Sequence, residues 1–262
     1  MSRSPPVTAE TYLYGIIRTP GPRQSRVCEV AGTGVGSPPA RVRLLPYEDL
    51  AAIVSTVDSS TIGEAGGVRG FMRDMAAHAD VLNRVLALRT VLPGRFGMIF
   101  PDDRTLIREI LAPQRDLLLD LLQQLKRAVE LRLSAEYVEA KVLEDVIRSQ
   151  PQLARQADGA SYHQRIDVGR RIARAIQQKR SADAQWILDR LSPAARDVSV
   201  GETVSELAVL RASFLVDRAG LQRFDRTLEG IQTKAGDTIR FACVGPLPPY
   251  SFAELRIPAA VC

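Results

Sequence analysis

The sequence predicts an α+β protein of two domains, and three observations support this prediction. Short segments with alternating apolar residues, typical of strands, are interspersed with segments whose apolar residues recur at helical spacing. A chain of 262 residues that is 45% hydrophobic can fill one large or two modest cores. An amphipathic helix that ends near residue 128 suggests a bridge, so we expect an N-terminal mixed α+β domain at 1–128 and a C-terminal α+β domain at 129–262.

The N-terminal domain begins with strand patterns. Apolar, β-prone residues predict strands at 11–18, 25–31, 40–45 and 51–57, and proline and glycine mark the turns between them. A helix follows at about 69–88, because its apolar residues lie close to helical spacing. The next strand is expected at 91–100, where Pro93 and two glycines favour an edge position or a bulge.

A helical region closes the N-terminal domain. Asp102 and Asp103 suit the first turn of a helix, and Pro113 predicts a kink or a new start. The stripe that follows favours core packing or domain bridging over a partner-helix site. It consists of Leu117, Leu118, Leu121, Leu122, Leu125 and Val129.

The C-terminal domain is predicted as strand, helices, strand, helix, strand. Strands are expected at 130–137, 209–216 and 238–244, and helices at 161–180, 183–191 and about 221–231. The first two helices are expected to separate near Ser181. This order is close to a ferredoxin-like arrangement with one strand unaccounted for.

Two segments with unusual residues carry a resemblance. The last strand runs into Gly245-Pro246-Leu247-Pro248-Pro249-Tyr250-Ser251-Phe252, where three prolines should take the chain out of the sheet in an extended form. The other segment is Leu92-Pro93-Gly94-Arg95-Phe96-Gly97, which His78 precedes. Together with Tyr12-Leu13-Tyr14-Gly15-Ile16-Ile17 and Gly159-Ala160-Ser161-Tyr162, they resemble the family of gas vesicle proteins F and L. This family has a larger apolar residue where the chain has Gly94.

The resemblance implies a fold and a function. It implies a modified ferredoxin-like C-terminal domain and an accessory protein that builds gas vesicles without catalysis. Such a protein would bind the hydrophobic gas vesicle shell protein and limit its aggregation, through edge strands or apolar grooves with charged surroundings. An alternative is a cytosolic scaffold that joins other accessory gas vesicle proteins without contacting the shell protein.

Composition favours a cytoplasmic protein. The three cysteines are far apart and form no Cys-x-x-Cys pair, so neither a disulfide framework nor a zinc site is expected. No apolar run approaches the roughly 18 residues of a membrane span, and no signal core follows the N-terminus. We therefore expect no membrane partner, and a location in the cytoplasm and at the gas vesicle.

A basic stretch lies between Arg148 and Arg180, with eight basic residues against Asp158 and Asp167. Such a stretch could bind nucleic acid or an acidic protein surface. No aromatic platform accompanies it, so the solvated side of a helix is the preferred interpretation, with Ile166, Ile172 and Ile176 facing inward and no nucleic-acid partner.

The sequence offers little catalytic chemistry. His78 and His163 are the only histidines, and neither has a partner at metal-ligand spacing. A surface or capping role on a helix is expected for both, while the family pattern implies that His78 could orient the region of Arg95. The glycine-rich Gly32–Ser37 lacks the Gly-Lys-Ser/Thr ending of a phosphate loop and is interpreted as a flexible hairpin loop. We expect no cofactor and no enzyme; a hydrolase with a spatial site near His78 is a distant alternative.

Candidate partner-binding residues come from three regions. In the two proline-bearing segments, apolar side chains could serve either packing or a partner, and Arg95 could either pair with a carboxylate or be presented to a partner. Three arginines of the basic stretch complete the set. The candidates are Leu92, Arg95, Phe96, Pro248, Pro249, Tyr250, Phe252, Arg170, Arg171 and Arg174.

Overall fold

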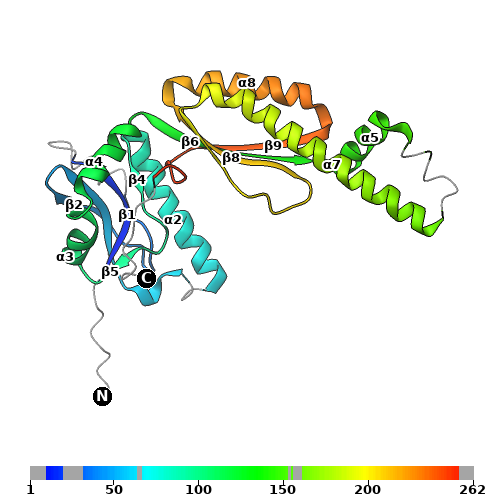
Figure 1. Ribbon diagram of the computed structural model, residues 1–262. Coiled ribbons are helices and arrows are strands. Elements are labelled where there is room, and N and C mark those ends of the chain that lie inside the picture. Colours follow the sequence, from blue (N-terminus) through cyan, green and yellow to red (C-terminus); the bar gives the residue numbers. More distant parts are fainter. Residues whose placement is uncertain (1–9, 20–31, 64–66, 153–154, 156–160, 254–262) are drawn as a thin grey trace, which may run out of the picture. The chain divides into compact units, whose positions relative to one another are not determined.

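The chain forms two compact units, seen in a computed structural model that describes residues 10–19, 32–63, 67–152, 155 and 161–253 (Figure 1). Unit 1 extends to Val129 and takes in the chain again from Leu247, and unit 2 is Glu130–Pro246. The expected division had placed everything after residue 128 in the second domain. In the structure, the last proline-rich segment instead packs with the first unit.

Unit 1 is built on an antiparallel sheet. Its strands are β1 (Glu10–Arg18), β2 (Val42–Tyr47), β3 (Leu50–Val57), β4 (Leu92–Pro93) and β5 (Ile99–Phe100). The order is β2-β3-β1-β4, and β5 also pairs with β1. The strands predicted at 11–18, 40–45 and 51–57 are confirmed. The one predicted at 25–31 lies outside the described residues.

The prediction of one strand at 91–100 is wrong. Only β4 and β5 belong to the sheet, and a loop separates them. The loop needs glycine at Gly97, which has a positive φ of 87°. The predicted edge position is confirmed, because β4 ends the strand order, and at an edge the missing N–H of Pro93 costs the sheet little.

Helices cover both faces of this sheet (Figure 1). They are α2 (Gly67–Leu88), α3 (Asp103–Leu106), a π-helical turn η4 (Ile107–Leu111) and α4 (Arg115–Gln124). Neighbouring residues of β1 point to opposite faces: Tyr12 reaches His78 of α2, whereas Thr11 donates to Asp103 of α3. The side chain of Asp102 caps α3 by accepting from the backbone N–H of Thr105 at 2.7 Å, and the new start after Pro113 is confirmed.

Unit 2 has the ferredoxin-like topology. Its elements are β6 (Ala128–Tyr137), α5 (Glu139–Ser149), α7 (Tyr162–Leu191), β7 (Asp197–Val200), β8 (Ala208–Asp217), α8 (Leu221–Ala235) and β9 (Ile239–Leu247). The sheet order is β7-β8-β6-β9, which is the β-α-β-β-α-β pattern with α5 added. The strand that the sequence left unaccounted for is β7.

Two helices of unit 2 differ from the prediction. Helix α5 was not predicted, and α7 continues through Ser181, where a break was expected. The Ser181 hydroxyl donates to the Gln177 carbonyl at 3.3 Å, a bond that lets serine sit within a helix. Helices α7 and α8 pack on one face of the sheet through a core that includes Ile187, Leu191, Phe214 and Phe224 (Figure 1).

Short 3-10 turns complete the described elements. They are Ser59–Thr61, Ser192–Ala194, Arg218–Gly220 and Gly236–Thr238.

Candidate protein-binding surface

A buried histidine holds the loop between β4 and β5. His78 Nε2 lies 3.2 Å from the Gly94 carbonyl oxygen, which can only accept, so Nε2 carries the hydrogen. In the neutral ring Nδ1 is then an acceptor, and the Tyr12 hydroxyl donates to it at 2.9 Å. The Gly97 N–H donates to the same hydroxyl at 3.1 Å. A chain of hydrogen bonds therefore runs from Gly97 through Tyr12 and His78 to Gly94, and it fixes both sides of the loop.

Burial keeps this histidine neutral. The side chain is 3% exposed, and burial lowers the pKa of His78 from 6.5 to about 4, while the bond to Gly94 opposes the shift. The expectation of a surface or capping role for His78 is therefore wrong. The sequence held a usable signal, because His78 is spaced with Val81, Leu82 and Val85 on the buried face of α2.

Two further buried groups hold the segment before β2. The Tyr14 hydroxyl accepts from the Val35 N–H at 2.9 Å and bonds Ser55 Oγ at 2.9 Å. Asp74 accepts from the N–H groups of Gly36 and Gly63, at 3.4 and 3.0 Å. Since Val35 is fully buried, the glycine-rich stretch predicted as a flexible hairpin loop is packed against the helix and the sheet.

Residues of both proline-bearing segments lie in the neighbourhood of Tyr12, although the segments are about 150 residues apart in the sequence. The ring of Phe96 lies 6.3 Å from that of Tyr12 and 5.9 Å from that of His78. The Tyr250 side chain is close enough to help raise the pKa of Tyr12, although burial is the larger cause. This convergence depends on the return of the chain to unit 1, which spacing in the sequence does not encode.

The predicted residues of these segments divide into buried and accessible ones. Leu92, Pro248 and Pro249 are buried, so their side chains are not available to a partner in this structure. Phe96, Tyr250 and Phe252 are partly exposed, and Arg95 is exposed. A site here would therefore consist of a charged side chain beside partly covered aromatic rings.

The loop passes very close to β1 at Gly94. Its N–H donates to the Tyr14 carbonyl at 2.7 Å, and a Cβ added there would lie 2.9 Å from that oxygen. The loop therefore approaches β1 so closely that a larger residue would push it away.

The basic residues of α7 belong to unit 2. Arg170, Arg171 and Arg174 are exposed, and Arg170 lies 3.5 Å from Asp167. Of the isoleucines expected to face inward, Ile172 and Ile176 pack near Val146 of α5, whereas Ile166 is 37% exposed.

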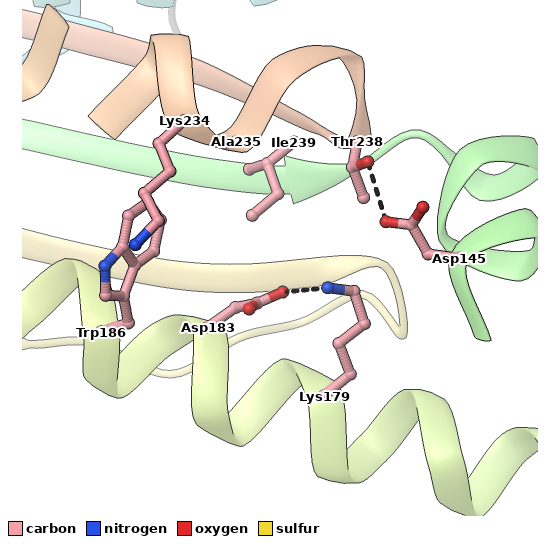
Figure 2. Close-up of a pocket in the computed structure, with 8 residues that line it drawn as sticks. All are labelled: Asp145, Lys179, Asp183, Trp186, Lys234, Ala235, Thr238 and Ile239. Carbon is pink, nitrogen blue, oxygen red and sulfur yellow. Dashed lines mark hydrogen bonds and ion pairs between the residues drawn. The ribbon is translucent and has the colours of Figure 1, made fainter. Parts of the chain in front are cut away.

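Unit 2 also contains a cavity of about 280 Å³ among α5, α7 and the end of α8 (Figure 2). Its charged groups are matched within the cavity wall. Lys179 pairs with Asp183 at 3.1 Å, Asp145 accepts from the Thr238 hydroxyl at 3.0 Å, and Lys234 lies over the ring of Trp186. Asp183 also accepts from the Tyr137 hydroxyl at 2.7 Å, and burial with this contact raises the pKa of Tyr137. These pairs hold the elements together and leave no nucleophile poised beside a base within the cavity wall.

The described residues contain neither a metal-binding cluster nor a membrane-spanning helix. Among them, no three His, Cys, Asp or Glu side chains are grouped so that they could hold a metal ion. No helix within the described ranges combines the length and the apolar character that a membrane crossing requires.

Comparison with known proteins identifies the family. Residues 10–254 match the family model of "Gas vesicle synthesis protein GvpL/GvpF". The chain belongs to this family. It is 36% identical to gas vesicle protein F of Streptomyces sp. (strain CB03234) over 93% of the chain and 99% of that protein. It is 28% identical to gas vesicle protein L of the same strain over 93% of the chain and 92% of that protein.

Solved structures support the fold of this family member. The crystal structure of gas vesicle protein GvpF from Anabaena sp. PCC7120 matches with a TM-score of 0.78 and 22% identity, over 95% of this chain and 99% of that one. The corresponding protein from Microcystis aeruginosa matches with a TM-score of 0.73. The α+β fold predicted from the sequence is confirmed.

Proposed function

We propose that this family member is a non-catalytic assembly factor that binds the gas vesicle shell protein in the cytoplasm and limits its aggregation until it enters the wall. The observation that carries the proposal is the fixed loop of Gly94–Met98, which presents exposed Arg95 next to partly exposed Phe96. A rigid loop loses little entropy on binding, so such a side chain contributes more to affinity.

The sheet edges add a second reason. Each proline-bearing strand, β4 in unit 1 and β9 in unit 2, lies at the end of its strand order. Prolines at an edge hinder self-association through the strand. The geometry around His78 argues against the hydrolytic alternative, because both ring nitrogens already have partners inside the fold.

The test is an aggregation assay with purified shell protein diluted from denaturant. We expect the wild-type chain to suppress light scattering and Arg95→Glu to weaken this suppression about tenfold or more, as at an interface hot spot. Arg223→Glu makes the same charge change at an exposed position of α8 and should behave as wild type.

Three results would count against the proposal. Equal suppression by wild type and Arg95→Glu would remove the loop from the binding site. If wild type left the scattering unchanged but bound another accessory gas vesicle protein, the scaffold alternative would replace the proposal. Turnover of a hydrolysable substrate that is lost in His78→Gln would make the chain an enzyme.

A further inference from the structure

One side of α2 is apolar and uncovered over its first two turns. We call this set the α2 stripe: Val68, Phe71, Met72 and Met75, which are 82%, 37%, 59% and 41% exposed. Their spacing of i, i+3, i+4 and i+7 places them in one row. Soluble proteins rarely leave such a row of large apolar side chains bare.

The same side of the helix is covered farther along. Leu86 follows Val68 by 18 residues, which is five helical turns, so both lie on one line of the helix. Leu86 is only 4% exposed, whereas Val68 is 82% exposed. The fold therefore packs the C-terminal part of this side and leaves the N-terminal part open.

The α2 stripe continues into the loop described above. The rings of Phe71 and Phe96 meet edge to face at 5.4 Å. Methionine side chains are flexible and polarizable, which suits a surface that adapts to a partner. The row is a helical ridge, and ridges of this kind pack into the grooves of a second helix.

Among the described residues, the charges around the α2 stripe are mostly positive. Arg69 and Arg73 flank it on α2, and exposed Arg95 follows from the loop beside Phe96. Of the carboxylates in this part of the helix, Asp74 is buried and pairs with Arg73 at 3.0 Å, and Asp80 lies about two turns farther along. Charge complementarity therefore favours a partner with carboxylates beside its apolar side.

We propose that the α2 stripe is a docking ridge for an amphipathic helix of the shell protein whose apolar face is flanked by carboxylates. The identity of the partner rests on the proposed function; the chemistry of the partner rests on the ridge and its charged rim. Arg95 would then serve both the loop site and the rim of this ridge.

The first experiment uses two designed helical peptides with the same apolar face, one flanked by Glu and one by Lys. We expect the Glu peptide to bind the full chain at least about tenfold more tightly, with an affinity that falls as salt is raised. Met72→Glu should weaken the Glu peptide about tenfold or more. Leu88→Glu, also an apolar-to-glutamate change at an exposed position of α2 but about 24 Å away, should not. Equal binding of both peptides, or binding unaffected by Met72→Glu, would overturn the inference.

The second experiment separates this inference from the proposed function. It measures the scattering of the shell protein with wild type, Met72→Glu and Leu88→Glu, after matched melting curves show that all three are folded. Loss of suppression in Met72→Glu alone is expected. Full suppression by all three would overturn the ridge and leave the proposed function standing. No suppression by wild type would overturn the proposed function and the partner assigned here. A wild-type dimer that Met72→Glu dissociates would also overturn that partner, because it would identify a second copy of the chain as the occupant of the ridge.

Discussion

Buried His78 should make the stability of unit 1 depend on pH. Its pKa in the folded chain is about 4, below its usual value of 6.5, so the unfolded chain binds the proton more readily between these values. The stabilising contribution is therefore complete above about pH 6.5 and is lost as the pH falls toward 4. At about 1.4 kcal/mol per pKa unit, the full loss is about 3 kcal/mol, of which about 2 kcal/mol should appear between pH 7.5 and pH 5.

The comparison of wild type with His78→Gln isolates this effect. The free energy of opening of β1 is measured by amide hydrogen exchange at both pH values, with the intrinsic exchange rates taken into account. Carboxylates contribute to both proteins and cancel in the difference. His78→Gln should be less stable at neutral pH, because it loses a packed ring, but its stability should change about 2 kcal/mol less with pH.

The chain has only one other histidine, which makes the control direct. His163 is exposed at the start of α7, so His163→Gln should keep the pH dependence of wild type. If His78→Gln kept the full pH dependence, or if His163→Gln lost it, the assignment of a neutral His78 bonded to Gly94 would be refuted.

Three further variants test the loop and the basic helix. Gly94→Val should destabilise unit 1 by about 1–3 kcal/mol, because its side chain would collide with the β1 backbone. Gly169→Ala, in the interior of α7 with open space around it, should instead stabilise the protein by about 0.5–1 kcal/mol. Thermal melts would show a lower melting temperature for the first variant and a higher one for the second. Changing Arg170, Arg171 and Arg174 together to Gln should alter stability by less than about 1 kcal/mol and leave vesicle formation intact. Loss of vesicles with a folded variant would identify those arginines as a docking surface.

The sequence predicted most elements in which the buried positions carry apolar residues at the spacing of a strand or a helix. Strand β1 is recognisable because it is buried along its length, and β6 because buried Leu131 and Leu133 alternate with exposed Arg132. Strand β7 escaped prediction because its side chains are exposed or half-buried, so no alternation marks it. The pairing that makes it a strand comes from the backbone of β8.

The candidate site was harder to predict, because it depends on contacts between distant segments. The sequence marked the unusual residues around Arg95 and Tyr250 but not that they converge on Tyr12. Leu92 and Pro249 were candidates for a partner because apolar character alone does not distinguish a core residue from an exposed one. The apolar spacing predicts an amphipathic helix at α2, but it does not distinguish the exposed residues of the first two turns from the buried residues that follow.

The loop before β5 depends both on its own unusual residues and on contacts with distant segments. Its backbone is held at four points: Gly94 donates to β1 and accepts from His78, Arg95 N–H donates to the Met98 sulfur at 3.3 Å, and Gly97 donates to Tyr12. Only the Arg95 side chain among them extends freely to solvent. The unusual residues of this segment therefore mostly shape its backbone, and under the proposed function a partner would contact one charged side chain and the apolar surface beside it.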